Sequence, residues 1–166
     1  MLRTFIACLM MSMAFCSCSD FVPSKKKLQV YTQITSTNDS LEKLTRVWHQ
    51  QLFASTKDKS FSRLRPYRIK IGQFLSYNRV QVASLQVPPK SQSLLDSEQA
   101  FLATQAALFS ETYSAFESFN EMTPNETINN QLRVASANLN NMLATKTAIT
   151  RSLEYYVEKN DIKIKK

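Results

Sequence analysis

The residues that could carry catalytic or metal-binding chemistry are few in this chain of 166 residues. All three cysteines, Cys8, Cys16 and Cys18, lie within the first 18 residues, so the rest of the chain cannot form a disulfide, a zinc knuckle or a thiol nucleophile. The single histidine, His49, has no Cys, Asp or Glu around it at the spacing of metal ligands. The single glycine, Gly72, cannot supply a phosphate-binding loop. We therefore expect no metal and no cofactor.

Carboxylates offer a second kind of chemistry. Glu117 and Glu121 would share one face of a helix, with Glu111 further back along the same segment. Such a pair could perform acid–base chemistry or hold a divalent ion, but an acidic, solvated helix face is the commoner arrangement. No Ser-His-Asp grouping is visible among the many serines. We predict that the protein is not an enzyme and that His49 has a structural or surface role.

The first twenty residues have the pattern of an export signal. One arginine is followed by an apolar stretch at residues 4–15, which is too short to span a bilayer, and then by small residues. The segment ends in Phe15-Cys16-Ser17-Cys18, which resembles the lipobox of bacterial lipoprotein precursors, whose last cysteine is lipidated and becomes the new N-terminus. Cys18 is the best match because a small residue precedes it, whereas a cut before Cys16 would follow the bulky Phe15.

The resemblance implies a signal peptide at residues 1–17, acyl chains on Cys18 and a place in the cell envelope. Ser19 stands where the enterobacterial sorting rule has Asp for inner-membrane retention, so the rule favours the outer membrane, with the domain facing the periplasm. The alternatives are an ordinary secretory peptide, which would leave a soluble periplasmic or secreted protein, and an uncleaved anchor. We interpret residues 18–37 as the lipidated N-terminus and a flexible tether, although residues 28–34 alternate and could form a short strand.

Residues 38–166 have the spacing of amphipathic helices. The first helix is expected to start near residues 38–40. Residues 61–87 fit either a helix or two strands, and we favour the helix because no glycine-bearing turn separates the would-be strands. A third helix should follow Pro88-Pro89, with Asp96 and Glu98 near its first turn, where carboxylates complement the helix dipole. Two apolar series at seven-residue spacing run through it: Leu94, Phe101, Leu108, Ala115 and Met122, and Leu95, Leu102, Phe109 and Phe116.

The last helix has the clearest start signal. Thr123, Pro124 and Glu126 have the spacing of a capping box with proline at the first helical position. Apolar residues recur along this helix at three- and four-residue steps from Ile128 to Tyr156, and Lys146 interrupts this seam. Asn120 could close the preceding helix in the left-handed conformation. The chain therefore predicts an all-α, up-and-down bundle of about four helices that ends in a long antiparallel helical hairpin. The alternative is an α+β fold with a small hairpin in residues 66–87.

The net charge of +8 is unevenly distributed. A basic cluster lies within one short stretch and contains Lys57, Lys59, Arg63, Arg65, Arg68 and Lys70. This cluster could contact an anionic surface such as lipid headgroups or a cell-wall polymer. In an antiparallel pairing, however, it would lie beside the acidic segment from Glu111 to Glu121, and we favour this mutual pairing. Export argues against nucleic acid as a partner, and we expect none.

An aromatic stripe at helical spacing contains Phe101, Phe109 and Phe116, which could form either core or an apolar groove. Together these features predict a membrane-anchored envelope lipoprotein that acts as a non-catalytic interaction or assembly factor. Its partners would be the membrane, through the N-terminal lipid, and another protein of the envelope. The alternative function is an envelope carrier that binds a lipid or a small apolar ligand inside the helical bundle.

Overall fold

The computed structural model describes residues 22–164, and within this range the chain is all-helical, without strands. The four long helices are α2 (Ser24–Asp58), α3 (Arg65–Ala83), α4 (Gln92–Ala107) and α5 (Asn125–Lys159). Short 3₁₀ and π turns join them: η1 (Phe61–Leu64), η2 (Pro89–Ser91), η3 (Leu108–Thr112) and η4 (Ser114–Ser118). The predicted all-α bundle is confirmed, and the α+β alternative is wrong because residues 65–83 form one helix. The predicted signal peptide, the lipobox-like segment and Cys18 lie outside the described residues.

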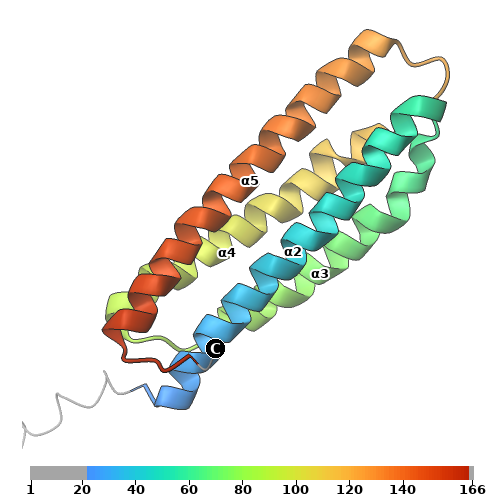
Figure 1. Ribbon diagram of the computed structural model, residues 1–166. Helices are drawn as coiled ribbons and strands as arrows, with labels where there is room; N and C mark the ends of the chain where they lie inside the picture. The colour runs from blue at the N-terminus through green and yellow to red at the C-terminus, as the bar shows by residue number, and fades with distance from the viewer. Residues whose placement is uncertain (1–21, 165–166) are drawn as a thin grey trace, which may run out of the picture.

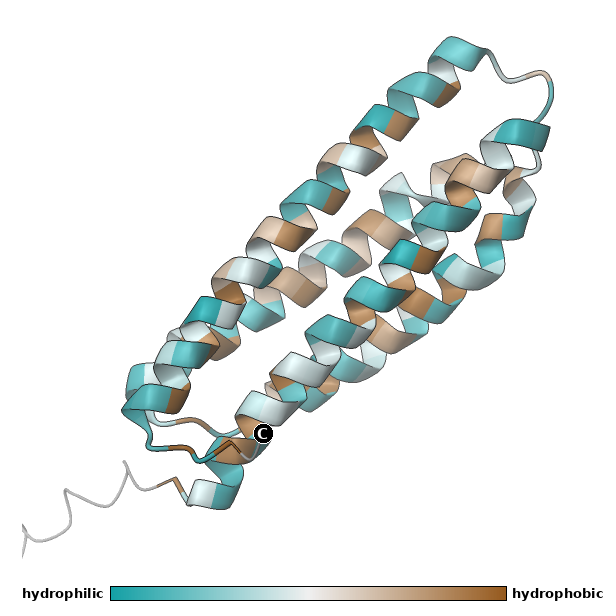
Figure 2. Ribbon diagram, in the orientation of Figure 1, coloured by the Kyte–Doolittle hydropathy of each residue, from teal (hydrophilic) through white to brown (hydrophobic). Residues whose placement is uncertain are grey.

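The helices run up and down, each antiparallel to the next (Figure 1). The two 35-residue helices, α2 and α5, lie beside each other and are each about 52 Å long at 1.5 Å per residue. We call the end that holds Ser24 and Lys159 the proximal end, and the end that holds Asp58 and Asn125 the distal end. Apolar residues face the inside of the bundle and polar residues face outward (Figure 2).

Helix α2 begins fourteen residues before the expected position. Its buried positions follow a three- and four-residue spacing along its whole length: Val30, Ile34, Thr37, Asn38, Leu41, Thr45, Trp48, His49, Leu52 and Ser55. Val30 and Ile34 are fully buried, so residues 24–37 are part of the bundle and not a tether or a strand. Polar side chains interrupt this seam in the sequence. The hydroxyl of Thr37, for example, can be buried at low cost because it donates to Asn78 Oδ1 on α3 at 2.9 Å.

Helix α3 occupies the segment that fitted both helix and strand. Pro66 lies in its first turn, where the missing N–H costs nothing, as expected. Ile71, Leu75, Asn78 and Val82 are its buried positions, and their four- and three-residue steps form one helical face. The apparent alternation of residues 67–71 therefore reflects exposed Ile69 beside buried Ile71 on a helix.

The third helical segment is not continuous to Met122. Helix α4 ends at Ala107, a π turn follows, and the N–H of Tyr113 donates to the carbonyl of Leu108 at 2.9 Å. The extra residue in this turn brings Phe109, Tyr113 and Phe116 onto Trp48 of α2, with ring centroids 4.5–5.8 Å from the indole. These rings form the aromatic core of the distal half. Met122 lies outside the seam and is 89% exposed.

Helix α5 has the long seam that was predicted. Its buried positions Ile128, Ala135, Met142, Ile149 and Tyr156 are seven residues apart, with Leu153 added. The capping box does not form. Thr123 Oγ1 instead accepts the N–H of Asn120 at 2.9 Å inside the preceding turn, and Pro124 precedes the first helical residue without a side-chain cap.

Asn120 is not the left-handed residue that was expected. Its side-chain Oδ1 accepts the N–H of Met122 at 2.9 Å, which closes a tight turn without a positive φ. The left-handed positions among the described residues are Lys59, directly after α2, and Asp161, after α5. The chain therefore reverses at the distal end through side-chain hydrogen bonds and a left-handed lysine, in place of glycine.

Candidate functional site

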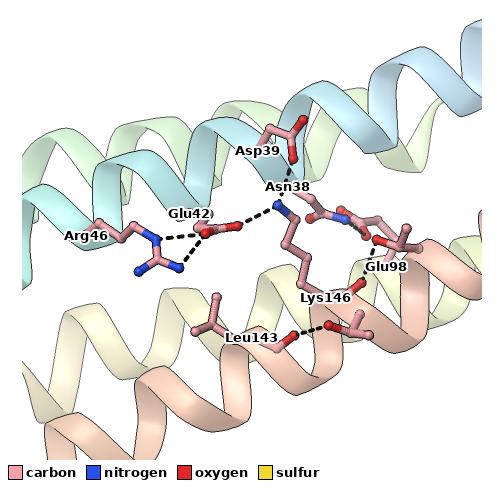
Figure 3. A network of polar contacts seen from close by, with 9 residues as sticks. Asn38, Asp39, Glu42, Arg46, Glu98, Leu143 and Lys146 are labelled. Atoms are coloured by element: carbon pink, nitrogen blue, oxygen red, sulfur yellow. Dashed lines mark hydrogen bonds and ion pairs between the residues drawn. The ribbon is translucent and has the colours of Figure 1, made fainter.

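A buried acid lies between α2 and α4 in the middle of the bundle. Glu98 is fully buried, and Asn38 Nδ2 donates to its Oε2 at 3.0 Å (Figure 3). Burial raises the pKa of Glu98 to about 7, with the Asn38 hydrogen bond acting in the opposite direction. Glu98 Oε1 and Asn38 Oδ1 have no partner in the described part of the chain. Ionisation would therefore add a charge to a site that already lacks donors. This placement corrects the prediction that Glu98 complements the helix dipole near the first turn.

A charged network lies one residue further along α2 and faces α5 (Figure 3). Lys146 Nζ lies 2.7 Å from Asp39 Oδ1 and 2.6 Å from Glu42 Oε2. Arg46 Nη2 lies 2.7 Å from the other oxygen of Glu42. The hydrogen bonds from Lys146 and then Arg46 hold the pKa of Glu42 below its usual value. Lys146, which interrupts the apolar seam of α5, therefore joins α5 to α2 through ion pairs.

His49 is buried, as a structural histidine would be. Its ring lies edge-on to Trp48, with centroids 5.1 Å apart, and to Tyr113 at 6.1 Å. Burial lowers the pKa of His49 to about 4, so the imidazole is neutral at physiological pH. Among residues 22–164, no group of three or more His, Cys, Asp and Glu side chains is placed to hold a metal ion.

The members of the basic cluster of residues 57–70 differ in whether they have a partner. Arg68 pairs with Glu117 through one edge of its guanidinium, as the antiparallel pairing predicted: Nε donates to Oε1, and Nη2 donates to Oε2 at 3.2 Å. Arg63 pairs with Asp58, and Lys59 donates to the carbonyl of Glu121 at 3.1 Å. The other members, Lys57, Arg65 and Lys70, form no ion pair within the described range.

The predicted apolar groove is core. Phe101, Phe109 and Phe116 are 6%, 1% and 0% exposed. Phe109 and Phe116 pack against Trp48, and Phe116 also stacks on Phe61 at 6.3 Å. The three rings therefore fill the interior and do not line an open surface.

Two hollows lie at opposite ends of the bundle. The distal hollow, of about 640 Å³, is open and mixed in charge, and is lined by residues 58–62 and 117–122. The proximal groove, of about 340 Å³, lies between the start of α4 and the end of α5. Its cations are Lys90, Arg151 and Lys159, and no carboxylate lines it.

Comparisons with protein-family models, with curated proteins and with solved structures gave no match. Over residues 22–164, no helix combines the length and the apolar character that crossing a membrane requires. The functional reading therefore depends on the residues themselves.

Sequence reasoning missed both the buried acid and the proximal groove. Glu98 could have been found, because it stands at a three- to four-residue step within the apolar series of α4, between Leu94 and Phe101. The groove left no such signal. Lys90 and Arg151 are 61 residues apart in the chain, and only the antiparallel packing of α4 and α5 brings them to one place.

Proposed function

We propose that this protein is a lipid-anchored protein of the bacterial envelope that acts without catalysis, by binding another envelope protein. The observation that carries the proposal is the lipobox-like sequence Phe15-Cys16-Ser17-Cys18 directly before the helical bundle. If Cys18 bears the lipid, six residue steps join it to the first residue of α2, a reach of about 20 Å at full extension. The proximal end would then be held close to the membrane surface, and no long flexible tether would intervene.

The distal end would extend about 52 Å from the anchored end, given the length of α2 and α5. There the open hollow of about 640 Å³ has apolar lining from Phe119 and from Met122, which is 89% exposed. An exposed methionine beside a hollow supports a protein partner at this end. The carrier alternative has less support, because Phe101, Phe109 and Phe116 fill the core that a ligand would need.

Mass spectrometry of the mature protein tests the anchor. We expect an N-terminal Cys18 that carries a diacyl or triacyl modification, and Cys18→Ser should move the protein from the membrane to the soluble fraction. Cys16→Ser is the matched control and should leave the protein in the membrane. An unmodified mature chain with a different first residue, or a Cys18→Ser protein that stays in the membrane, would refute the proposed anchoring.

Site-specific crosslinking tests the partner. A photo-reactive residue at Met122 should give an adduct of discrete mass in intact cells, and the same residue at Val80, 66% exposed on α3, is the control. If both positions give the same adducts, or neither gives any, the distal end is not the partner-binding surface.

A further inference from the structure

The proximal groove is cationic, and no carboxylate lines it. Arg151 also borders a neighbouring hollow that Glu42 and Glu154 line, but it makes no ion pair with either of them. Lys90 comes from η2, and Arg151 and Lys159 come from α5, two turns apart on that helix. None of the three takes part in an ion pair within residues 22–164. The neighbouring acids Asp96, Glu154 and Glu158 do not line the groove, and Asp96 accepts a hydrogen bond from Gln92 at 3.0 Å.

The remaining lining suits an anion with several oxygens. Four serine hydroxyls line the groove. Those of Ser97 and Ser152 donate to the carbonyls of Ser93 and Ala148, whereas those of Ser91 and Ser93 make no hydrogen bond within the described residues. Its base is apolar and rigid, because Leu94 and Tyr156 are buried to within 4%. The ring of Tyr155 lies under Lys159, whose Nζ is 5.4 Å from the ring centroid, and this contact holds the ammonium beside the groove.

The groove lies at the end of the bundle where the described chain begins. The hydroxyl of Tyr156 donates to the carbonyl of Lys27 at 3.4 Å, and Lys26 donates to Gln86 in the connection between α3 and α4. The start of α2, the start of α4 and the end of α5 therefore meet here (Figure 1). The groove consequently opens at the end that the proposed anchor would bring to a membrane surface.

We infer that the proximal groove binds a phosphate group, with Arg151 gripping two oxygens and Lys90 and Lys159 neutralising the charge. Guanidinium matches phosphate in geometry, and the hydroxyls of Ser91 and Ser93 supply neutral donors to the remaining oxygens. The volume of about 340 Å³ admits a phosphorylated headgroup or a small phosphate ester. That the phosphate belongs to a lipid rests on the proposed function, whereas the phosphate site itself does not.

Titration of the full chain, purified in a nonionic detergent, tests the site. Inorganic phosphate at low ionic strength should shift backbone amide resonances of residues 90–97 and 151–159 saturably. Arg151→Ala with Lys159→Ala should weaken this binding about tenfold or more, because it removes two of the three cations. Lys43→Ala with Arg79→Ala is the matched control: both residues are exposed and outside the groove, the same two charges are lost, and the affinity should change little.

A second arm separates the sources of phosphate. Micelles doped with phosphatidylglycerol are compared with micelles doped with phosphatidylcholine. Saturable shifts with inorganic phosphate support a soluble ligand, and the same amides shifting only with phosphatidylglycerol support a lipid headgroup. If neither probe shifts these amides, or if both double variants lose affinity equally, the groove is not a phosphate site. Neither arm requires the acyl anchor, so failure here is distinct from failure of the Cys18 experiment.

Discussion

The two ends of this bundle differ in where their cations come from along the chain and in whether carboxylates lie beside them. The distal end holds the densest run of lysine and arginine, and half of that cluster, Lys57, Arg65 and Lys70, forms no ion pair within the described residues. Arg63 and Arg68, however, are paired with Asp58 and Glu117, and carboxylates line the hollow at this end. The proximal groove takes its three cations from two distant segments, and none of them is paired within the described residues. Charge density along a chain therefore does not predict an available cationic site. Availability depends on whether a carboxylate lies within reach after folding.

The interiors of the two halves differ as well. The distal half is packed with aromatic rings around Trp48, whereas the next part of the core toward the proximal end contains the buried Asn38–Glu98 and Thr37–Asn78 hydrogen bonds. Aromatic packing stabilises by burial of large apolar surface, and hydrogen-bonded polar pairs at best offset their own desolvation. We therefore expect the distal half to contribute most to stability, and the buried Glu98 to make stability fall as pH rises.

The largest expected effect is the loss of a distal ring. Phe116→Ala should lower the free energy of unfolding by about 3–5 kcal/mol, because the ring is fully buried between Trp48 and Phe61. Phe53→Ala is the matched control and should cost much less, because Phe53 is 54% exposed. Urea denaturation at pH 7 measures both. Equal losses would show that the aromatic core does not dominate stability.

The second-largest expected effect is the pH dependence that the buried acid Glu98 gives to the free energy of unfolding. The pKa of Glu98 is about 7 in the folded protein, above its ordinary value of 4.5. The unfolded chain therefore loses this proton first, and the free energy of unfolding should fall as pH rises from about 4.5 to about 7. The expected loss is about 3 kcal/mol, at 1.36 kcal/mol per pKa unit. Glu98→Gln, which keeps an amide in hydrogen-bonding range of Asn38, should be more stable than the parent protein at pH 8 and similar at pH 4.5.

His49 should make the free energy of unfolding change with pH in the opposite direction. The Glu98→Gln variant should reveal this change. The pKa of His49 is about 4 in the folded protein and 6.5 in the unfolded chain, so the free energy of unfolding should fall as pH falls from 6.5 to 4. In the parent protein the two slopes oppose each other between pH 4.5 and 6.5. Glu98→Gln should uncover the histidine slope, measured by urea denaturation across this range. A Glu98→Gln protein with the same pH profile as the parent would show that Glu98 is not buried as a neutral acid.

The smallest expected effect tests directly whether pairing makes the two ends different. Glu117→Gln should cost about 1 kcal/mol, because the pair is partly buried and Arg68 loses its partner. The freed guanidinium should also give the distal end a weak, salt-sensitive affinity for inorganic phosphate, seen as shifts of amides near Arg68. Glu126→Gln, exposed at the start of α5, is the control and should give no such shifts. If Glu117→Gln gains no phosphate affinity, factors other than pairing separate the two ends.

How much could be predicted differed from one helix to another. The α5 seam was predicted almost completely, because its apolar residues recur every seven positions without polar substitutes at most of them. The first four turns of α2 were not predicted, because Thr37 and Asn38 occupy buried positions of the helix and polar residues in such positions are typical of a linker. The sequence suggested that Lys146 interrupts the apolar seam of α5. In the structure, Lys146 joins that helix to Asp39 and Glu42 of α2.

The sequence by itself determined the helical class and the break at Pro88-Pro89, because periodicity and proline geometry are local properties of the chain. The pairing of Arg68 with the acidic segment could also be predicted, because opposite charges lie in helices that an antiparallel connection brings together. Only the tertiary structure decided where α2 begins, that Glu98 is buried, and that Lys90, Arg151 and Lys159 meet in one groove. The physical reason is that a polar side chain is buried or left unpaired according to what the opposite helix presents, and one helix's sequence does not contain its neighbour's face.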